Sequence, residues 1–207
     1  NYVKATVTHF KGRVHCYEIW NEPDCAYSWK HGNSAEEYAA FTMFTAKICR
    51  EADPDCKLFG FALGNKKREA YRNALCATGV CKVLDGITYH AYHTDDASID
   101  EAFHVYDDVR KNFNPSLKVI QGESGTQSSG NGSGALEGGA WTQLKQSKYL
   151  LRHLLIDLAN GVEFTSYFSC MDMVEALNGL TSDVKSYLDY GYFGVIGADF
   201  DEEGHST

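Results

Sequence analysis

Short runs of β-branched and aromatic residues alternate along the chain with longer segments whose apolar positions recur every three or four residues. The short runs predict strands and the longer segments predict helices. Five strands are expected, at residues 14–20, 57–63, 86–92, 117–121 and 163–169. Each gap between them holds a loop, a helix and a return, so the pattern predicts an α/β fold with a parallel sheet.

Capping signals mark where two of the helices begin. Ser34 followed by Glu37 is a capping box, and the helical period continues from it until residues 53–54, Asp-Pro, which stop the helix. Ser98 with Glu101 repeats the same device before a second amphipathic segment. The first ten residues also have a helical pattern, so the chain is expected to begin within a helix.

A further helix is expected at residues 142–160, with Gly161 as its left-handed cap. Its apolar stripe consists of leucines, which we expect to face the core: Leu144, Leu151, Leu154, Leu155 and Leu158. Residues 122–139 hold seven of the 19 glycines and predict a flexible loop directly after a strand. Residues 170–207 predict a long irregular tail without a final helix, in which residues 199–203 form an acidic run.

Composition and charge are those of a globular protein and narrow the choice of partner. The chain has 207 residues, 43% of them apolar, which is enough for one domain with a sizeable core. A net charge of −9 disfavours binding to nucleic acid or to anionic membrane surfaces. No apolar run approaches the roughly 18 residues of a membrane span, and no targeting signal is expected from the first ten residues.

The seven cysteines cannot all pair within the chain, because their number is odd. No Cys-x-x-Cys pair occurs, so zinc-site spacing is absent. We expect reduced thiols packed as small apolar groups, with one or more disulfides as the alternative. Cytoplasmic and secreted locations both remain open.

Two glutamates stand at the carboxyl ends of predicted parallel strands. Glu22 lies in Ile-Trp-Asn-Glu-Pro, residues 19–23, and Glu123 lies in Ile-Gln-Gly-Glu-Ser-Gly, residues 120–125. In a barrel these strand ends converge on one rim, so carboxylates far apart in sequence can act together on a glycosidic bond. One carboxyl must be protonated to release the leaving oxygen, and the other must be ionised to attack the anomeric carbon.

The third strand adds two more candidates near the same rim. Period-two alternation places His90 and Tyr92 on one face. A metal site of His90, His93, Asp95 and Asp96 is a weaker alternative, since alternation turns His93 away from His90. We therefore expect no metal or other cofactor.

Together these motifs resemble clan A glycoside hydrolases, the retaining (β/α)8 families with the acid/base on the fourth strand and the nucleophile on the seventh. The resemblance implies that Glu22 is the acid/base, that Asn21 binds the sugar 2-hydroxyl and that Glu123 is the nucleophile. It also implies that Tyr92 lies near the nucleophile and that His90 faces the substrate or the acid/base. Among the families of this clan, the sequence most resembles families 39 and 5.

Many clan members carry a substrate-stacking Trp after the eighth strand, where this chain has Ser-Tyr-Phe-Ser at residues 166–169. Tyr167 or Phe168 is the expected replacement. Other aromatic candidates for a sugar platform are Trp20, Tyr27, Trp29 and Trp141. Glu18, which alternates with Trp20 and Glu22, is expected to be a buried structural carboxylate with a basic partner.

The resemblance numbers the five strands four to eight. Residues 1–207 are then a single truncated catalytic domain that lacks strands one to three and the closing helix, so we expect this portion alone to be unstable and inactive. The expected activity is retaining hydrolysis of an oligosaccharide, polysaccharide or glycoside, with carboxyl groups roughly 5 to 5.5 Å apart. The alternative is a carbohydrate-binding barrel without turnover.

Overall fold

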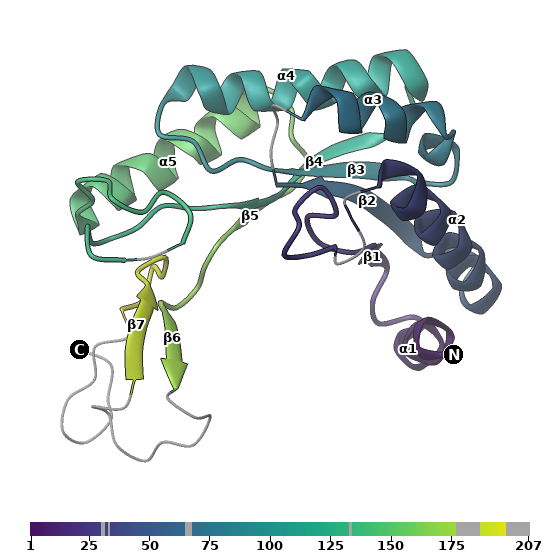
Figure 1. The fold of residues 1–207 in the computed structure, drawn as a ribbon, viewed down its shortest axis with the longest axis horizontal. Coiled ribbons are helices and arrows are strands. Elements are labelled where there is room, and N and C mark those ends of the chain that lie inside the picture. The colour runs from purple at the N-terminus through teal and green to yellow at the C-terminus, as the bar shows by residue number, and fades with distance from the viewer. Residues whose placement is uncertain (30–31, 33, 65–67, 133, 177–186, 198–207) are drawn as a thin grey trace. The chain divides into compact units, whose positions relative to one another are not determined.

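The computed structural model describes residues 1–29, 32, 34–64, 68–132, 134–176 and 187–197. Five strands form one parallel sheet in the order β1-β2-β3-β4-β5, and a helix follows each of the first four (Figure 1). The fold is α/β, a partial (β/α)8 barrel. The strands and helices are β1 (Cys16–Glu18), β2 (Lys57–Leu63), β3 (Gly86–His90), β4 (Lys118–Ser124), β5 (Thr165–Tyr167), β6 (Met173–Ala176), β7 (Tyr187–Gly191), α1 (Tyr2–Phe10), α2 (Ala35–Ala52), α3 (Glu69–Ala77), the 3-10 helix η1 (Val80–Lys82), α4 (Asp96–Phe113) and α5 (Gln143–Ala159).

All five expected strands are present, and β2 matches its expected range to the residue. Ser34 is confirmed as the N-cap of α2, because its hydroxyl accepts the N–H of Glu37 at 3.2 Å, while the Glu37 carboxylate accepts a hydrogen bond from Trp29. Helix α4 begins two residues before Ser98, whose N–H is capped by Asp95 instead. The expectation of a wholly irregular tail is wrong, because β6 and β7 pair antiparallel within it. The acidic run at residues 199–203 lies outside the described residues.

The chain divides into two compact units, which we describe separately. Unit 1 contains Asn1–His90, Glu101–Gly122 and Val162–Phe164, and unit 2 contains Ala91–Asp100, Glu123–Gly161 and Thr165–Thr207. In unit 1, Tyr38 of α2 is fully buried, and its hydroxyl group links two strands. It donates to the carbonyl of Ile19 at 2.9 Å and accepts the N–H of Phe61 at 3.0 Å, so α2 is fixed against the ends of β1 and β2.

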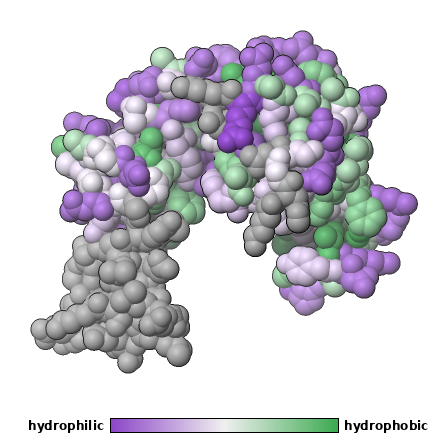
Figure 2. Space-filling model, viewed as in Figure 1, coloured by the Kyte–Doolittle hydropathy of each residue, from purple (hydrophilic) through white to green (hydrophobic). Residues whose placement is uncertain are grey.

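The outer helices of unit 1 pack on the sheet through aromatic side chains. Tyr89 of β3 stacks on Tyr106 of α4 with ring centroids 5.1 Å apart. Arg72 of α3 lies over the Tyr106 ring, 6.0 Å from its centroid. The surface over α3 and α4 is largely hydrophilic (Figure 2), as expected for solvent-facing helices. No helix in the described part of the chain is long and apolar enough to cross a membrane.

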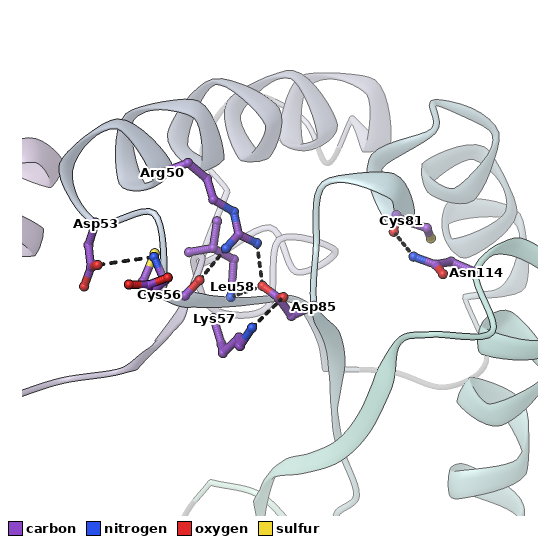
Figure 3. Close-up of polar contacts among 9 residues, drawn as sticks. Arg50, Asp53, Cys56, Lys57, Leu58, Cys81, Asp85 and Asn114 are labelled. Carbon is purple, nitrogen blue, oxygen red and sulfur yellow. Dashed lines mark hydrogen bonds and ion pairs between the residues drawn. The ribbon is translucent and has the colours of Figure 1, made fainter. Parts of the chain in front are cut away.

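Asp85 joins α2, β2 and the loop before β3 at the amino-terminal ends of the strands (Figure 3). Its carboxylate accepts the N–H of Leu58 at 2.8 Å and a hydrogen bond from Arg50 at 2.6 Å, with Lys57 3.7 Å away. Burial alone would raise the pKa of Asp85, but these donors and charges outweigh it and lower that pKa. Arg50 also donates to the carbonyl of Cys56. The same side chain therefore connects the loop between α2 and β2 to Asp85.

We expect the Asp85→Ala variant to lower the free energy of unfolding by about 2 kcal/mol at pH 7, because the Leu58 N–H and Arg50 lose their acceptor. Denaturant unfolding of the protein at its full natural length measures the change. Since the folded-state pKa is lowered, this stabilisation is present above the unfolded value of about 3.9 and disappears as the pH falls through the folded pKa. The matched control is Asp108→Ala, whose side chain is 69% exposed and lies 3.9 Å from Lys111. It should change stability by about 0.5 kcal/mol or less, and an equal loss in both variants would contradict the prediction.

In unit 2, helix α5 has the expected boundaries but buries the opposite face. The expectation that its leucines face the core is wrong, because they are 41% to 72% exposed: Leu144, Leu151, Leu154, Leu155 and Leu158. The buried side chains are instead polar or amphipathic: Gln146, Tyr149, His153 and Asp157. Polar contacts explain this choice: His153 Nδ1 shares a hydrogen bond with the Tyr149 hydroxyl at 3.0 Å, and its Nε2 lies 3.3 Å from a carboxylate oxygen of Asp157. Asp157 also accepts a hydrogen bond from Thr165 of β5 at 2.7 Å.

Candidate functional site

Glu22 follows β1 in an unusual backbone conformation within unit 1. Its φ is 47°, a left-handed value that is uncommon for a residue other than glycine. Its N–H donates to the carbonyl of Ala62 at 2.9 Å. Ala62 and Phe61 also have positive φ, at a point where the register between β2 and β3 shifts. Such irregular strand ends re-aim side chains beside functional sites.

Glu22 is 8% exposed, and its side chain is held by a histidine. Its Oε1 lies 2.7 Å from Nδ1 of His90, which ends β3 and is 3% exposed. Gly64 lies on another side of the carboxyl group: a Cβ at Gly64 would stand 2.8 Å from Glu22 Cδ and Oε1. The carboxyl group of Glu22 is therefore confined between His90 Nδ1 and the backbone of Gly64, where any side chain would collide with it.

Asp24, which the sequence reasoning missed, holds that backbone in place. It has no solvent exposure, and its Oδ1 accepts the N–H of Gly64 at 3.0 Å while its Oδ2 lies 3.7 Å from Arg68 Nε. Burial, followed by the charges of Asp24 and Glu22, raises the pKa of Cys25 to about 11. The only sequence signal for Asp24 was its place two residues after Glu22, which alone does not distinguish it from a solvated turn residue.

Glu123 lies near the end of β4 and is half-buried in unit 2. The hydroxyl of Tyr92 donates to its Oε1 at 2.6 Å. The N–H of Ala91 donates to the Glu123 carbonyl at 2.9 Å, which aligns the two segments. This hydrogen bond fixes the direction of the Glu123 carboxylate.

The residues after Glu123 explain the glycine of the motif. The Phe168 N–H donates to the Ser124 carbonyl at 2.6 Å, and a Cβ at Gly125 would stand 1.9 Å from the Phe168 carbonyl oxygen. The Phe168-Ser169 peptide bond is cis. Only glycine leaves room for β5 to end beside the motif.

A residue of the tail also contributes to this side of unit 2. Phe193 is 3% exposed and packs edge-on against Tyr92 and Phe168, with centroid distances of 6.2 and 5.5 Å. Gln146 of α5 donates to the Phe193 carbonyl at 3.3 Å, and Gln127 accepts the N–H of Tyr192 at 2.9 Å. The sequence reasoning missed Phe193, because the tail has no periodic pattern that would assign it to the site.

The candidate aromatic platforms differ in exposure. Trp20 is 47% exposed and Tyr27 is 74% exposed, whereas Trp29 is half-buried and donates to Glu37 at 3.1 Å. Trp141 is 6% exposed, with Lys145 Nζ 4.3 Å from its ring centroid, so its ring is already covered. Tyr167 and Phe168 are half-buried.

Two further candidates on β1 and after it are exposed. Asn21 is exposed beside Glu22. The expectation that Glu18 is buried is wrong: it is exposed, because β1 is the edge strand of the sheet. A Cβ at Gly122 would stand 3.1 Å from Glu18 Oε2. The Glu18 carboxylate therefore lies close to the backbone of Gly122, the residue before Glu123.

Two members of the alternative metal set have structural roles. Asp95 caps α4 by accepting the N–H of Ser98 at 2.9 Å, and Asp96 forms an ion pair with Arg152 at 2.5 Å. His90 is joined to Glu22, as described above.

Several solved structures with a similar fold are glycosidases. The chain aligns over 100% of its length with a monomeric β-xylosidase from Caulobacter crescentus, at 16% identity and a TM-score of 0.69, and covers 43% of that protein. A GH39 enzyme from Xanthomonas axonopodis gives 16% identity, a TM-score of 0.70 and 100% and 42% coverage. A β-D-glucuronidase from Dictyoglomus thermophilum gives 13% identity, a TM-score of 0.60 and 95% and 32% coverage.

The chain has the fold of these glycosidases. It spans less than half of the length of each. No family model and no curated protein matches the sequence. The likeness is therefore one of fold. Any proposal about chemistry has to be argued from Glu22 with His90 and from Glu123 with Tyr92.

Proposed function

We propose that this chain is part of a retaining glycoside hydrolase that cleaves O-glycosidic bonds by double displacement. Glu123 attacks the anomeric carbon while Glu22, protonated, donates its proton to the departing oxygen. Glu22 then removes a proton from water, which attacks the glycosyl-enzyme and releases Glu123. The observation that carries the proposal is that each carboxyl group has its own buried or half-buried partner, His90 for Glu22 and Tyr92 for Glu123.

The surroundings of the two carboxyl groups hold both of them in place. Glu22 is 8% exposed and is confined by His90 and Gly64. Glu123 accepts a hydrogen bond from Tyr92, which directs its carboxylate. Asn21, Trp20, Tyr167 and Phe168 are proposed to bind the sugar, and His90 and Tyr92 to orient the carboxyl groups.

We also propose that the five parallel strands β1 to β5 are strands four to eight of an eight-stranded barrel. The motif order supports this numbering, and so does the exposed leucine face of α5, which is too apolar for a helix in contact with water alone. A closing helix would cover such a face in a complete barrel. Residues 1–207 alone are then expected to lack turnover.

The stereochemistry of the product tests the mechanism. The protein at its full natural length is incubated with aryl β-xylosides, β-glucosides and β-glucuronides, and NMR follows the first sugar released. A β-anomer formed before mutarotation is expected. If the α-anomer were released first, the enzyme would be inverting and double displacement would be ruled out. Binding of the substrates without phenol release from any of them would favour a carbohydrate-binding barrel. Residues 1–207 alone are the control, and phenol release by them would contradict the truncated-barrel proposal.

A further inference from the structure

The pairing between the chain after β1 and the end of β2 breaks off beside Glu22. The N–H of Glu22 donates to the carbonyl of Ala62 at 2.9 Å. In a regular parallel ladder, the next bond runs from the N–H of Gly64 to the carbonyl of Glu22. That carbonyl instead accepts the N–H of Cys25 at 2.9 Å, because the chain turns at Glu22. The N–H of Gly64 therefore needs another acceptor.

The side chain of Asp24 supplies this acceptor. Its Oδ1 accepts the N–H of Gly64 at 3.0 Å and the thiol of Cys25 at 3.9 Å, which is free like the other six cysteines. Its Oδ2 lies 3.7 Å from Arg68 Nε and makes no hydrogen bond within the described part of the chain. Asp24 has no solvent exposure, and a fully buried carboxylate is a costly acceptor for one backbone N–H. This cost points to a role beyond stability.

Gly64 is also the backbone against which the Glu22 carboxyl group rests. A Cβ at Gly64 would stand 2.8 Å from Glu22 Cδ and Oε1, so the two groups are in close contact. On another side, Oε1 lies 2.7 Å from His90 Nδ1. If Gly64 lost its acceptor, this contact would loosen, and the carboxyl group would be free to turn away from His90.

We propose that Asp24 is a positioning residue for the acid/base, a role that rests on the function proposed above for Glu22. Its hydrogen bond to Gly64 holds the end of β2 against the Glu22 carboxyl group and fixes the direction in which that group gives and takes protons. Proton transfer requires the acid to be within hydrogen-bond reach of the departing oxygen. Asp24 acts only through Gly64 and Glu22.

The leaving group of the substrate tests this role, because a poor leaving group needs the acid and a good one does not. Asp24→Ala is made in the protein at its full natural length, and kcat/KM is measured for an alkyl and a dinitrophenyl glycoside of the same sugar. The value for the alkyl glycoside should fall by on the order of 10²-fold, and that for the dinitrophenyl glycoside should stay within about threefold. The ratio of the two values does not depend on the fraction of folded protein, so a merely structural role would not change it.

A double variant tests whether Asp24 acts through Glu22. Once Glu22 is replaced by Ala, no acid remains to be positioned. Glu22→Ala/Asp24→Ala should therefore match Glu22→Ala on the alkyl glycoside within about threefold. Asp24→Asn keeps an oxygen acceptor for the N–H of Gly64 and should recover kcat/KM to within about fivefold of the native value.

Asp53→Ala is the matched control, because Asp53 is also a buried aspartate of unit 1, 4% exposed, that accepts a backbone N–H, that of Asp55, at 3.3 Å. It should leave the ratio for the two leaving groups unchanged. If Asp24→Ala does not fold, Asp24→Ser gives the same comparison, because a serine hydroxyl is too short to take the place of Asp24 Oδ1.

An equal loss for both leaving groups in Asp24→Ala, or a loss that adds to that of Glu22→Ala, would overturn the positioning role. If Glu22→Ala still separated the leaving groups, the acid/base role of Glu22 would stand and only the role of Asp24 would fall. If neither single variant separated them, or if the native protein turned over neither substrate, the proposed function and the role of Asp24 would both be wrong.

Discussion

Replacing Glu123 by Gln should lower kcat by on the order of 10⁴-fold, for every substrate that the protein turns over. The amide keeps the shape of the side chain and can still accept the hydrogen bond that Tyr92 donates at 2.6 Å. It cannot form the glycosyl-enzyme, because an amide is a poor nucleophile and a poor leaving group. Steady-state rates with an aryl glycoside measure the loss, and circular dichroism checks that the fold is kept.

Glu137→Gln is the matched control for this variant, since Glu137 is exposed and lies in the same loop region after β4. It should leave kcat and KM unchanged within about twofold. If Glu123→Gln retained a kcat within threefold of the native value, Glu123 could not be the nucleophile. Another carboxylate would then have to be the nucleophile, while the description of the fold would stand.

Local chemistry explains which elements could be predicted from the sequence. Helix α2 was predictable because Ser34 caps it through a hydrogen bond to Glu37, three residues away. Helix α3 escaped because it has only nine residues and Arg68, at its N-cap, makes no side-chain cap hydrogen bond. Helix α1 also has nine residues and no side-chain cap hydrogen bond, yet its helical pattern was evident, so a cap strengthens the sequence signal without being required for it.

The orientation of α5 shows what local pattern cannot settle. Five leucines favoured one face, but the structure buries the face with Gln146, Tyr149 and His153. Gln146 satisfies carbonyls of Thr126 and Phe193, which lie 20 and 47 residues away in sequence. A buried polar side chain is stable only when such distant partners exist, and a helical period carries no information about them.

The candidate site divides in the same way. The places of the two glutamates were predictable, because each lies in a short motif near the carboxyl end of a strand. A close contact with the backbone of Phe168 explains why Gly125 is a glycine. Asp24 and Phe193 were not, since their importance comes from Gly64 and Tyr92, which they meet only in the folded chain. Residues that hold other residues in place are the part of a site that one sequence does not show.

Replacing Glu22 by Ala should separate substrates by their leaving groups. For alkyl or sugar leaving groups, which need protonation, kcat should fall by on the order of 10³-fold. For a dinitrophenyl glycoside, whose departing oxygen needs no proton, the first step should change little and the second should become slow, so that a burst of phenol precedes the steady state. Azide should then restore turnover and yield a β-glycosyl azide, because a small anion can occupy the space of the lost side chain.

The pH profile gives Glu22 a second and independent signature. Activity of the native protein should fall as the pH rises through the pKa of the acid, since the ionised group cannot donate a proton; this limb should vanish in Glu22→Ala. Glu51→Gln, exposed on α2, is the control and should keep the limb and respond to no azide. A Glu22→Ala protein that lost activity equally for all leaving groups and gained nothing from azide would remove Glu22 from the acid/base role. Its contact with His90 at 2.7 Å would then be a structural one.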